Sequence, residues 1–217
     1  TGNTIRPALQ LLKTKPGISS VSGFFLMEVP DCEFGENGLF VFADCAVNTD
    51  FDSNKLAEIA GLSAESFKML EPKVAMLSYS SMGSAKHDDV TKVADAVKIA
   101  HEKFPELKLD GELQLDAALV PSVGEAKAPG SSVAGHANTL VFPSLEAGNT
   151  CKSWCLWSGS SGSVHAGKRS VQRMLRRRYR RRSSYHSCTG SAGIINTNWN
   201  QMDGELAPRQ RILNPFN

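Results

Sequence analysis

The sequence predicts an α/β protein in which one sheet lies between two layers of helices, a three-layer α/β/α fold. Two observations predict this class. Short apolar segments typical of buried strands alternate along the chain with longer segments in which apolar residues recur at helical spacing. The chain has 217 residues, of which 41% are hydrophobic and 21% charged, so it can bury a sizeable core. We expect the layered domain to occupy residues 21–150.

The first expected elements are two strands and a helix. Residues 21–29 and 39–43 each contain an apolar run, and the Gly and Asn residues between them signal a turn, which favours an antiparallel pair. Apolar residues recur at helical spacing between residues 53 and 70, and Asp52 or Ser53 is the candidate N-cap.

A second strand and helix pair follows, and then a last strand. Residues 74–77 have the composition of a buried strand, and a helix capped by Asp88 or Asp89 is expected to end at Pro105. The last strand is expected at residues 139–142. In sheets of this kind, function is expected in the loops after the strand ends.

The residues after about 150 differ from those before them in charge and in pattern. Residues 151–217 contain 12 Lys and Arg against 2 Asp and Glu, a net charge of +10, so residues 1–150 carry −8. The stretches 151–167 and 173–182 show neither strand nor helix periodicity, and we expect this basic tail to be poorly ordered.

The composition also excludes several classes of protein. No run of 18 apolar residues occurs and the chain does not open like a signal peptide, so we expect a cytoplasmic protein without a membrane anchor, whose true start lies upstream. The cysteines are scattered, without paired spacing or histidine partners, which argues against a disulfide framework and against a metal site. They are Cys32, Cys45, Cys151, Cys155 and Cys188.

Two segments could bind a phosphate group. Thr4 and Arg6 precede an apparent helix, where a guanidinium fork and backbone N–H groups suit an anion. The loop from Ser78 to Lys86 follows a predicted strand and is rich in hydroxyls and glycine, so its backbone amides could approach an anion with Lys86 as a point charge. Within it, Ser80 and Ser84 are the candidate substrate contacts. On composition alone, an ordinary serine-rich connector is an equally good interpretation.

The acidic stretch at residues 110–116 could supply carboxylates for proton transfer. We expect solvated loop carboxylates instead, because general acid–base work requires perturbed pKa values, which a sequence cannot show.

Nine segments together resemble the phosphate acetyltransferases in order and spacing, and the match covers residues 1–150 almost without a gap. They are Thr-Ile-Arg-Pro-Ala-Leu-Gln at 4–10, Lys-Thr-Lys-Pro-Gly at 13–17, Pro-Asp-Cys-Glu-Phe-Gly at 30–35, Phe-Ala-Asp at 42–44, Val-Ala-Met-Leu-Ser-Tyr-Ser at 74–80, Gly-Ser-Ala-Lys at 83–86, Asp-Gly-Glu-Leu-Gln-Leu-Asp-Ala-Ala at 110–118, Lys-Ala-Pro-Gly-Ser at 127–131 and Val-Phe-Pro-Ser-Leu-Glu-Ala-Gly-Asn at 141–149.

The resemblance implies a two-domain enzyme, similar in fold to the isocitrate and isopropylmalate dehydrogenases. Such an enzyme moves an acetyl group reversibly between acetyl phosphate and coenzyme A, which is a substrate rather than a bound cofactor. Members of the family are commonly homodimers. Residues 1–20 would form the joining helix and the end of an incomplete first domain, and residues 21–150 the second domain.

In this family an Asp takes the proton of the coenzyme A thiol, while Arg and Ser side chains hold the phosphate and the developing oxyanion. Arg6 matches the phosphate-binding Arg of the family's Thr-x-Arg-Pro motif. The Asn-Asp-Leu-Ser-Arg-Gly motif and the Asp beyond it are absent from this sequence. The catalytic residues therefore stay unassigned, and we expect the chain by itself to be inactive.

The tail suggests why that motif is absent. Reverse-translated with ordinary codons and read one nucleotide later, residues 157–167 can spell Gly-Ala-Ala-Ala-Val-Gly-Pro-Phe-Met-Gln-Gly, and residues 175–187 can spell Cys-Asp-Asp-Val-Ile-Asp-Val-Val-His-His-Ile-Thr-Arg. Both are similar to segments expected in the family. We interpret residues 151–190 as frameshifted, so the arginine run is a translation of Asp codons in another register.

Two alternative functions stay open. A phosphate butyryltransferase would use the same phosphate site with a roomier acyl pocket. A nucleic-acid-binding protein would use the basic tail for phosphate contacts, for which we expect only non-specific retention at low salt.

Overall fold

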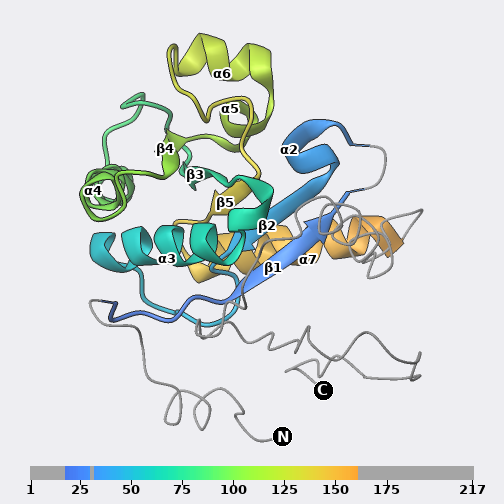
Figure 1. The fold of residues 1–217 in the computed structure, drawn as a ribbon, viewed down its shortest axis with the longest axis horizontal. Helices are drawn as coiled ribbons and strands as arrows, with labels where there is room; N and C mark the ends of the chain where they lie inside the picture. Colours follow the sequence, from blue (N-terminus) through green and yellow to red (C-terminus); the bar gives the residue numbers. More distant parts are fainter. Residues whose placement is uncertain (1–17, 30–31, 161–217) are drawn as a thin grey trace, which may run out of the picture.

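Five strands form one mixed sheet in the computed structural model, which describes residues 18–29 and 32–160 (Figure 1). The sheet order is β1-β2-β5-β3-β4, in which β1 runs antiparallel to β2 and the other neighbours are parallel. The α/β class predicted from the sequence is therefore confirmed. The strands are β1 (Phe24–Glu28), β2 (Leu39–Ala43), β3 (Lys73–Leu77), β4 (Lys108–Leu113) and β5 (Thr139–Val141).

Helices cover both faces of the sheet and enclose two hydrophobic cores. Alternate residues of a strand point to opposite faces, so Val74 and Met76 enter one core while Ala75 and Leu77 enter the other. The first core is closed by α3 (Ser53–Ser66) and α4 (Asp88–Lys103), and the second by α5 (Leu115–Leu119), α6 (Pro121–Lys127) and α7 (Leu145–Ser160) (Figure 1). The short helices α2 (Phe34–Asn37) and η1 (Lys68–Leu70) complete the described elements.

The two long helices begin close to where the sequence predicts. Asp52 caps α3, accepting a hydrogen bond from the Lys55 backbone N–H at 2.7 Å, as predicted. The expected cap of α4 was wrong by one residue. His87 has extended dihedral angles and its Nδ1 accepts from the backbone of Asp89, which leaves both aspartates in the first turn, where their charges suit the helix dipole.

The acidic stretch at residues 110–116 is not a solvated loop. Its first half belongs to β4, because Leu109 and Leu113 bury their side chains in the two cores and draw the polar residues between them into the strand. Glu112 is only 4% exposed as a result. The two short helices α5 and α6, which follow β4, were not predicted.

The packed domain does not stop at residue 150. Helix α7 continues to Ser160, and Lys152 is 8% exposed, with its Nζ 4.6 Å from the centre of the Phe25 ring. The expectation that packing ends at residue 150 is corrected by this contact. Residues 1–17 and 161–217 lie outside the described residues, so the joining helix, the incomplete first domain and the arginine-rich run are not tested. The likeness to the dehydrogenases also stays a prediction.

Candidate functional site

The candidate site lies at the carboxyl edge of the sheet. Strands β2, β5, β3 and β4 are parallel, so their carboxyl ends face the same edge, which is where ligands bind in sheets of this type. The segment after β3 contacts the end of β4 directly, since the Ser78 N–H donates to the Leu113 carbonyl at 2.9 Å. We call residues 78–86 the serine loop.

The backbone N–H groups in the serine loop are already hydrogen-bonded within the protein. Each amide from residue 80 to residue 85 donates to an acceptor inside the protein. The pairs are Ser80 N to Ser78 Oγ, Ser81 N to Ser84 Oγ, Met82 N to Glu112 O, Gly83 N to Glu112 Oε1, Ser84 N to Ser81 O and Ala85 N to Ser80 Oγ. The loop is therefore not an open set of amides waiting for an anion, which corrects that interpretation of its composition.

The predicted substrate contacts in this loop differ in exposure. Ser80 is fully buried, and its hydroxyl donates to Glu112 Oε1 at 2.9 Å. Ser84 and Lys86 are exposed and offer a hydroxyl and an ammonium group at the surface. Ser80 thus lies inside the loop, whereas Ser84 and Lys86 lie at the surface of the protein.

The start of α4 adds no anion site next to this loop. Asp88 and Asp89 occupy its first turn, and their negative charges already oppose an incoming anion. Lys86, exposed at the end of the serine loop, carries a positive charge, which an anion would favour.

The other carboxylates near this edge have partners of their own. Asp44, fully buried after β2, accepts hydrogen bonds from the backbone N–H groups of Ala46, Val47 and Asn48 and from the Asn48 side chain. A hydrogen bond from Lys127, at 2.8 Å, holds the pKa of Asp116 below its ordinary value. Because its pKa lies below the ordinary value, Asp116 is not poised to exchange a proton near neutral pH.

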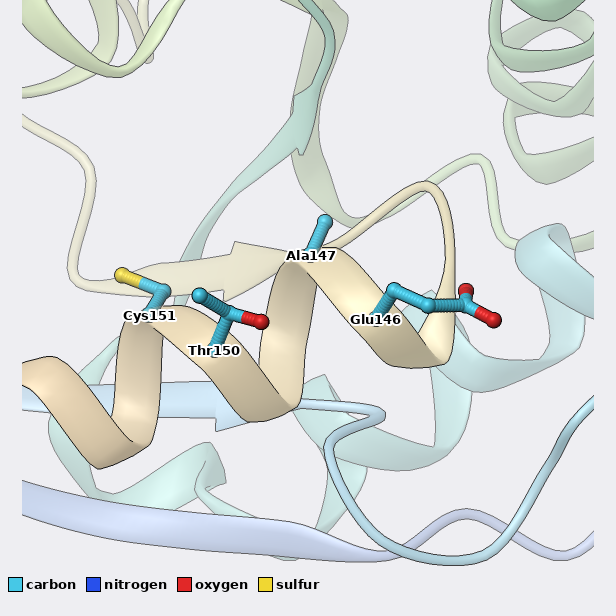
Figure 2. A pocket seen from close by; sticks show the side chains of 4 residues that line it. All are labelled: Glu146, Ala147, Thr150 and Cys151. Atoms are coloured by element: carbon cyan, nitrogen blue, oxygen red, sulfur yellow. The ribbon is translucent and has the colours of Figure 1, made fainter.

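A shallow depression of about 550 Å³ lies along α7 (Figure 2), and Ser80, Ser84 and Lys86 are not among its lining residues. Its lining residues are Glu146, Ala147, Thr150 and Cys151, all on one face of the helix. Arg6 and Thr4 fall outside the described residues, so their place relative to the serine loop is not tested.

Within residues 18–29 and 32–160, no group of three or more His, Cys, Asp or Glu side chains could hold a metal ion. No helix in the same residues is long and apolar enough to cross a membrane.

The mixed sheet with helices on both faces defines an α/β domain, a class in which ligands usually bind at segments that follow parallel strands. A family model narrows this class, because the model described as "Phosphate acetyl/butaryl transferase" matches residues 1–160. The chain belongs to this family.

Individual relatives agree with the family match. The phosphate acetyltransferase of Thermoanaerobacterium thermosaccharolyticum is 59% identical over 152 residues, which is 69% of this chain and 46% of that protein. Among solved structures, the EutD phosphotransacetylase of Staphylococcus aureus has a TM-score of 0.67 and 52% identity, covering 73% of this chain and 48% of that one. A branched-chain phosphotransacylase from Enterococcus faecalis has a TM-score of 0.52 and 26% identity, covering 71% of this chain and 52% of that one. The chain spans about half the length of the relatives it matches.

Sequence reasoning missed the role of Glu112, whose carboxylate contacts the serine loop. The spacing of Leu107 and Leu109 was the available signal for a strand, and the register shift before Leu113 turns that residue to the opposite core. No sequence pattern shows that its carboxylate turns toward a loop about 30 residues earlier in the chain, since that contact depends on β3 and β4 lying side by side.

Proposed function

We propose that this chain carries part of the substrate site of a phosphate acetyltransferase, which moves an acetyl group reversibly between acetyl phosphate and coenzyme A. The observation that carries the proposal is the 59% identity over 152 residues to an enzyme of that name. Acetyl phosphate is already an activated acyl donor, so such a site works chiefly by positioning and by stabilising charge.

The roles of the site residues follow from this proposal. Arg6 and Thr4 hold the phosphate, and Ser84 and Lys86 add a hydroxyl and a positive charge from the serine loop. Ser80 supports that loop from within. Coenzyme A is a substrate, and the proposal requires no cofactor.

The acetyl reaction is favoured over the butyryl alternative by the degree of similarity. The relative named for acetyl transfer is 59% identical, whereas the branched-chain phosphotransacylase is 26% identical. The nucleic-acid alternative has no comparable support, because its arginine run lies outside the described residues.

A chimeric enzyme tests the proposal. Residues 1–150 would replace the matching segment of the Thermoanaerobacterium thermosaccharolyticum enzyme, and formation of acetyl-CoA from acetyl phosphate and coenzyme A would be followed by thioester absorbance. We expect kcat/KM within about tenfold of the parent, because a shift of that size is only about 1.4 kcal/mol of transition-state stabilisation. The 217-residue chain alone should form no thioester. A chimera that folds like the parent and is inactive would contradict the proposal.

A further inference from the structure

We infer that Glu112 is a positioning residue whose buried carboxylate fixes the serine loop and thereby presents Ser84 and Lys86 to an anionic substrate. The loop part of this inference stands on the contacts described below. The substrate part rests on the proposed function.

Glu112 accepts three hydrogen bonds from the loop through two groups, its carboxylate and its backbone carbonyl. Its Oε1 accepts from the Ser80 hydroxyl at 2.9 Å and from the Gly83 N–H at 2.7 Å, and its backbone carbonyl accepts from the Met82 N–H at 3.0 Å. A carboxylate that is 4% exposed requires such donors, because burying a charge without hydrogen bonds is costly. The same contacts give the loop one fixed shape.

Ser80 connects Glu112 to Ser84 and Ala85 in the second half of the loop. Its hydroxyl donates to Glu112, accepts from the Ala85 N–H at 3.0 Å and lies 3.2 Å from the Ser84 hydroxyl. Removing the Glu112 carboxylate would leave the buried Ser80 hydroxyl and the Gly83 amide without their acceptor. The position of Ser84 depends on that acceptor through Ser80.

The backbone of Met82 supports the same conclusion. Its φ of 48° lies in the left-handed region, which costs a residue with a side chain on the order of 1–2 kcal/mol. A strained conformation persists where its surroundings determine it, and the hydrogen bonds at Met82 and Gly83 both lead to Glu112.

We call the three hydrogen bonds from the serine loop to Glu112 the Glu112 lock. This lock also affects how the loop could recognise an anion. Glu112 already accepts from Gly83, and the neighbouring amides have internal acceptors, so the loop backbone does not bind the substrate. Recognition then falls to exposed side chains. Lys86 supplies a positive charge. Because the Ser80 hydrogen goes to Glu112, the Ser84 hydroxyl is the donor in the contact with Ser80, and it can donate to an anion by exchanging that contact.

Amide hydrogen exchange on the 217-residue chain tests the lock. In Glu112→Ala, the amides of Gly83 and Ala85 should exchange at least about tenfold faster relative to that of Met76 in β3, because the loss of a buried acceptor favours local opening of the loop. Glu112→Gln retains an oxygen acceptor, so loop protection should stay within about threefold of wild type.

Glu58→Ala is the matched control, because Glu58 is also a 4% exposed carboxylate but contacts Ser19, Ser20 and Lys103 instead of the loop. In this variant the exchange of loop and strand amides should change in parallel. If the loop amides and the strand amides of Glu112→Ala change their exchange rates in parallel, as in the control, the lock is overturned. So would a Glu112→Gln variant that exchanges as fast as Glu112→Ala.

Titration with acetyl phosphate tests the substrate part separately. The amide resonances of Ser84 and Lys86 should shift on binding to the wild-type chain, and Glu112→Ala should weaken the apparent affinity at least about tenfold, or about 1.4 kcal/mol. Equal affinity in both proteins would overturn the positioning role. Absence of any shift in wild type would count against the serine loop as a substrate site, while the exchange experiment still decides the lock.

Discussion

Glu58 joins three segments of the chain through one buried carboxylate. Its Oε2 accepts from Ser19 and Ser20, which precede the sheet, and its Oε1 accepts from Lys103 at the end of α4. Burial alone would raise the pKa of Glu58, but the hydrogen bonds from Ser20, Ser19 and Lys103 outweigh it and lower the pKa below its ordinary value.

Stability should therefore depend on pH through Glu58. A carboxyl group with a lowered folded pKa contributes stability above its unfolded pKa of about 4.3, and this contribution is lost as the pH falls through the folded pKa. We expect Glu58→Gln to be less stable than wild type at pH 7 and the difference to shrink below about pH 4. Urea unfolding at several pH values measures this difference in the free energy of unfolding. The control is Glu125→Gln, which replaces an exposed carboxylate of α6. A difference that is constant with pH would contradict this assignment.

Cys45 is a structural thiol. It is fully buried, and burial together with the adjacent Asp44 raises the pKa of its thiol to about 12. Because the thiolate is the reacting form, iodoacetamide at pH 8 should modify Cys45 on the order of 10³-fold more slowly in the native chain than in urea. Peptide mass spectrometry after timed alkylation measures the rate. Modification of native Cys45 at the unfolded rate would show that the thiol is accessible.

At the residue scale, the sequence predicted the Asp52 cap because a cap depends on neighbours within one helical turn. It did not predict the Glu112 lock, which depends on the pairing of β3 and β4. The predicted role of Arg6 stays a prediction, since it comes from the resemblance and lies outside the described residues.

At the element scale, β5 is the central strand that joins the two halves of the sheet. It pairs with β2 on one side and β3 on the other, and Leu140 is 1% exposed within the second core. We expect Leu140→Ala to lower the free energy of unfolding by about 2–5 kcal/mol, because it leaves a cavity in a packed core. Met69→Ala, at a side chain that is 54% exposed, should change it by less than about 0.5 kcal/mol. Urea denaturation compares the two, and similar small losses would contradict the central role of β5.

The elements that the sequence predicted well are those with a strong local signal. This signal is a continuous apolar run in β2 and β3 and helical spacing of apolar residues in α3 and α4, and all four elements are present. The short helices α5 and α6 have too few residues for a helical period to be seen, and their positions depend on packing against the second core. Helix α7 was not predicted either, because residues 151–167 show no helical period and the contact of Lys152 with Phe25 depends on tertiary packing.

At the scale of the whole chain, the change in charge after residue 150 has a direct test. The frameshift interpretation predicts that the coding nucleotides near codon 150 differ from a continuous family reading frame by an inserted or deleted nucleotide. Reading the frame one nucleotide later should then give family-like sequence at residues 157–167 and 175–187. An uninterrupted frame without either segment would show that the basic tail is a genuine part of the protein.

If residues 1–150 supply the phosphate side of an acyltransferase site, as we propose, substitution of Arg6 tests this proposal most directly. A bidentate guanidinium contact should strengthen as charge collects on the departing phosphate, so it assists the transition state as well as binding. In the active chimera, we expect Arg6→Lys to lower kcat/KM for acetyl phosphate at least about tenfold, or about 1.4 kcal/mol, and Arg6→Ala to lower it further, with little change in the KM for coenzyme A. Near-parental kcat/KM in Arg6→Ala would contradict the account, because the phosphate would then be held elsewhere.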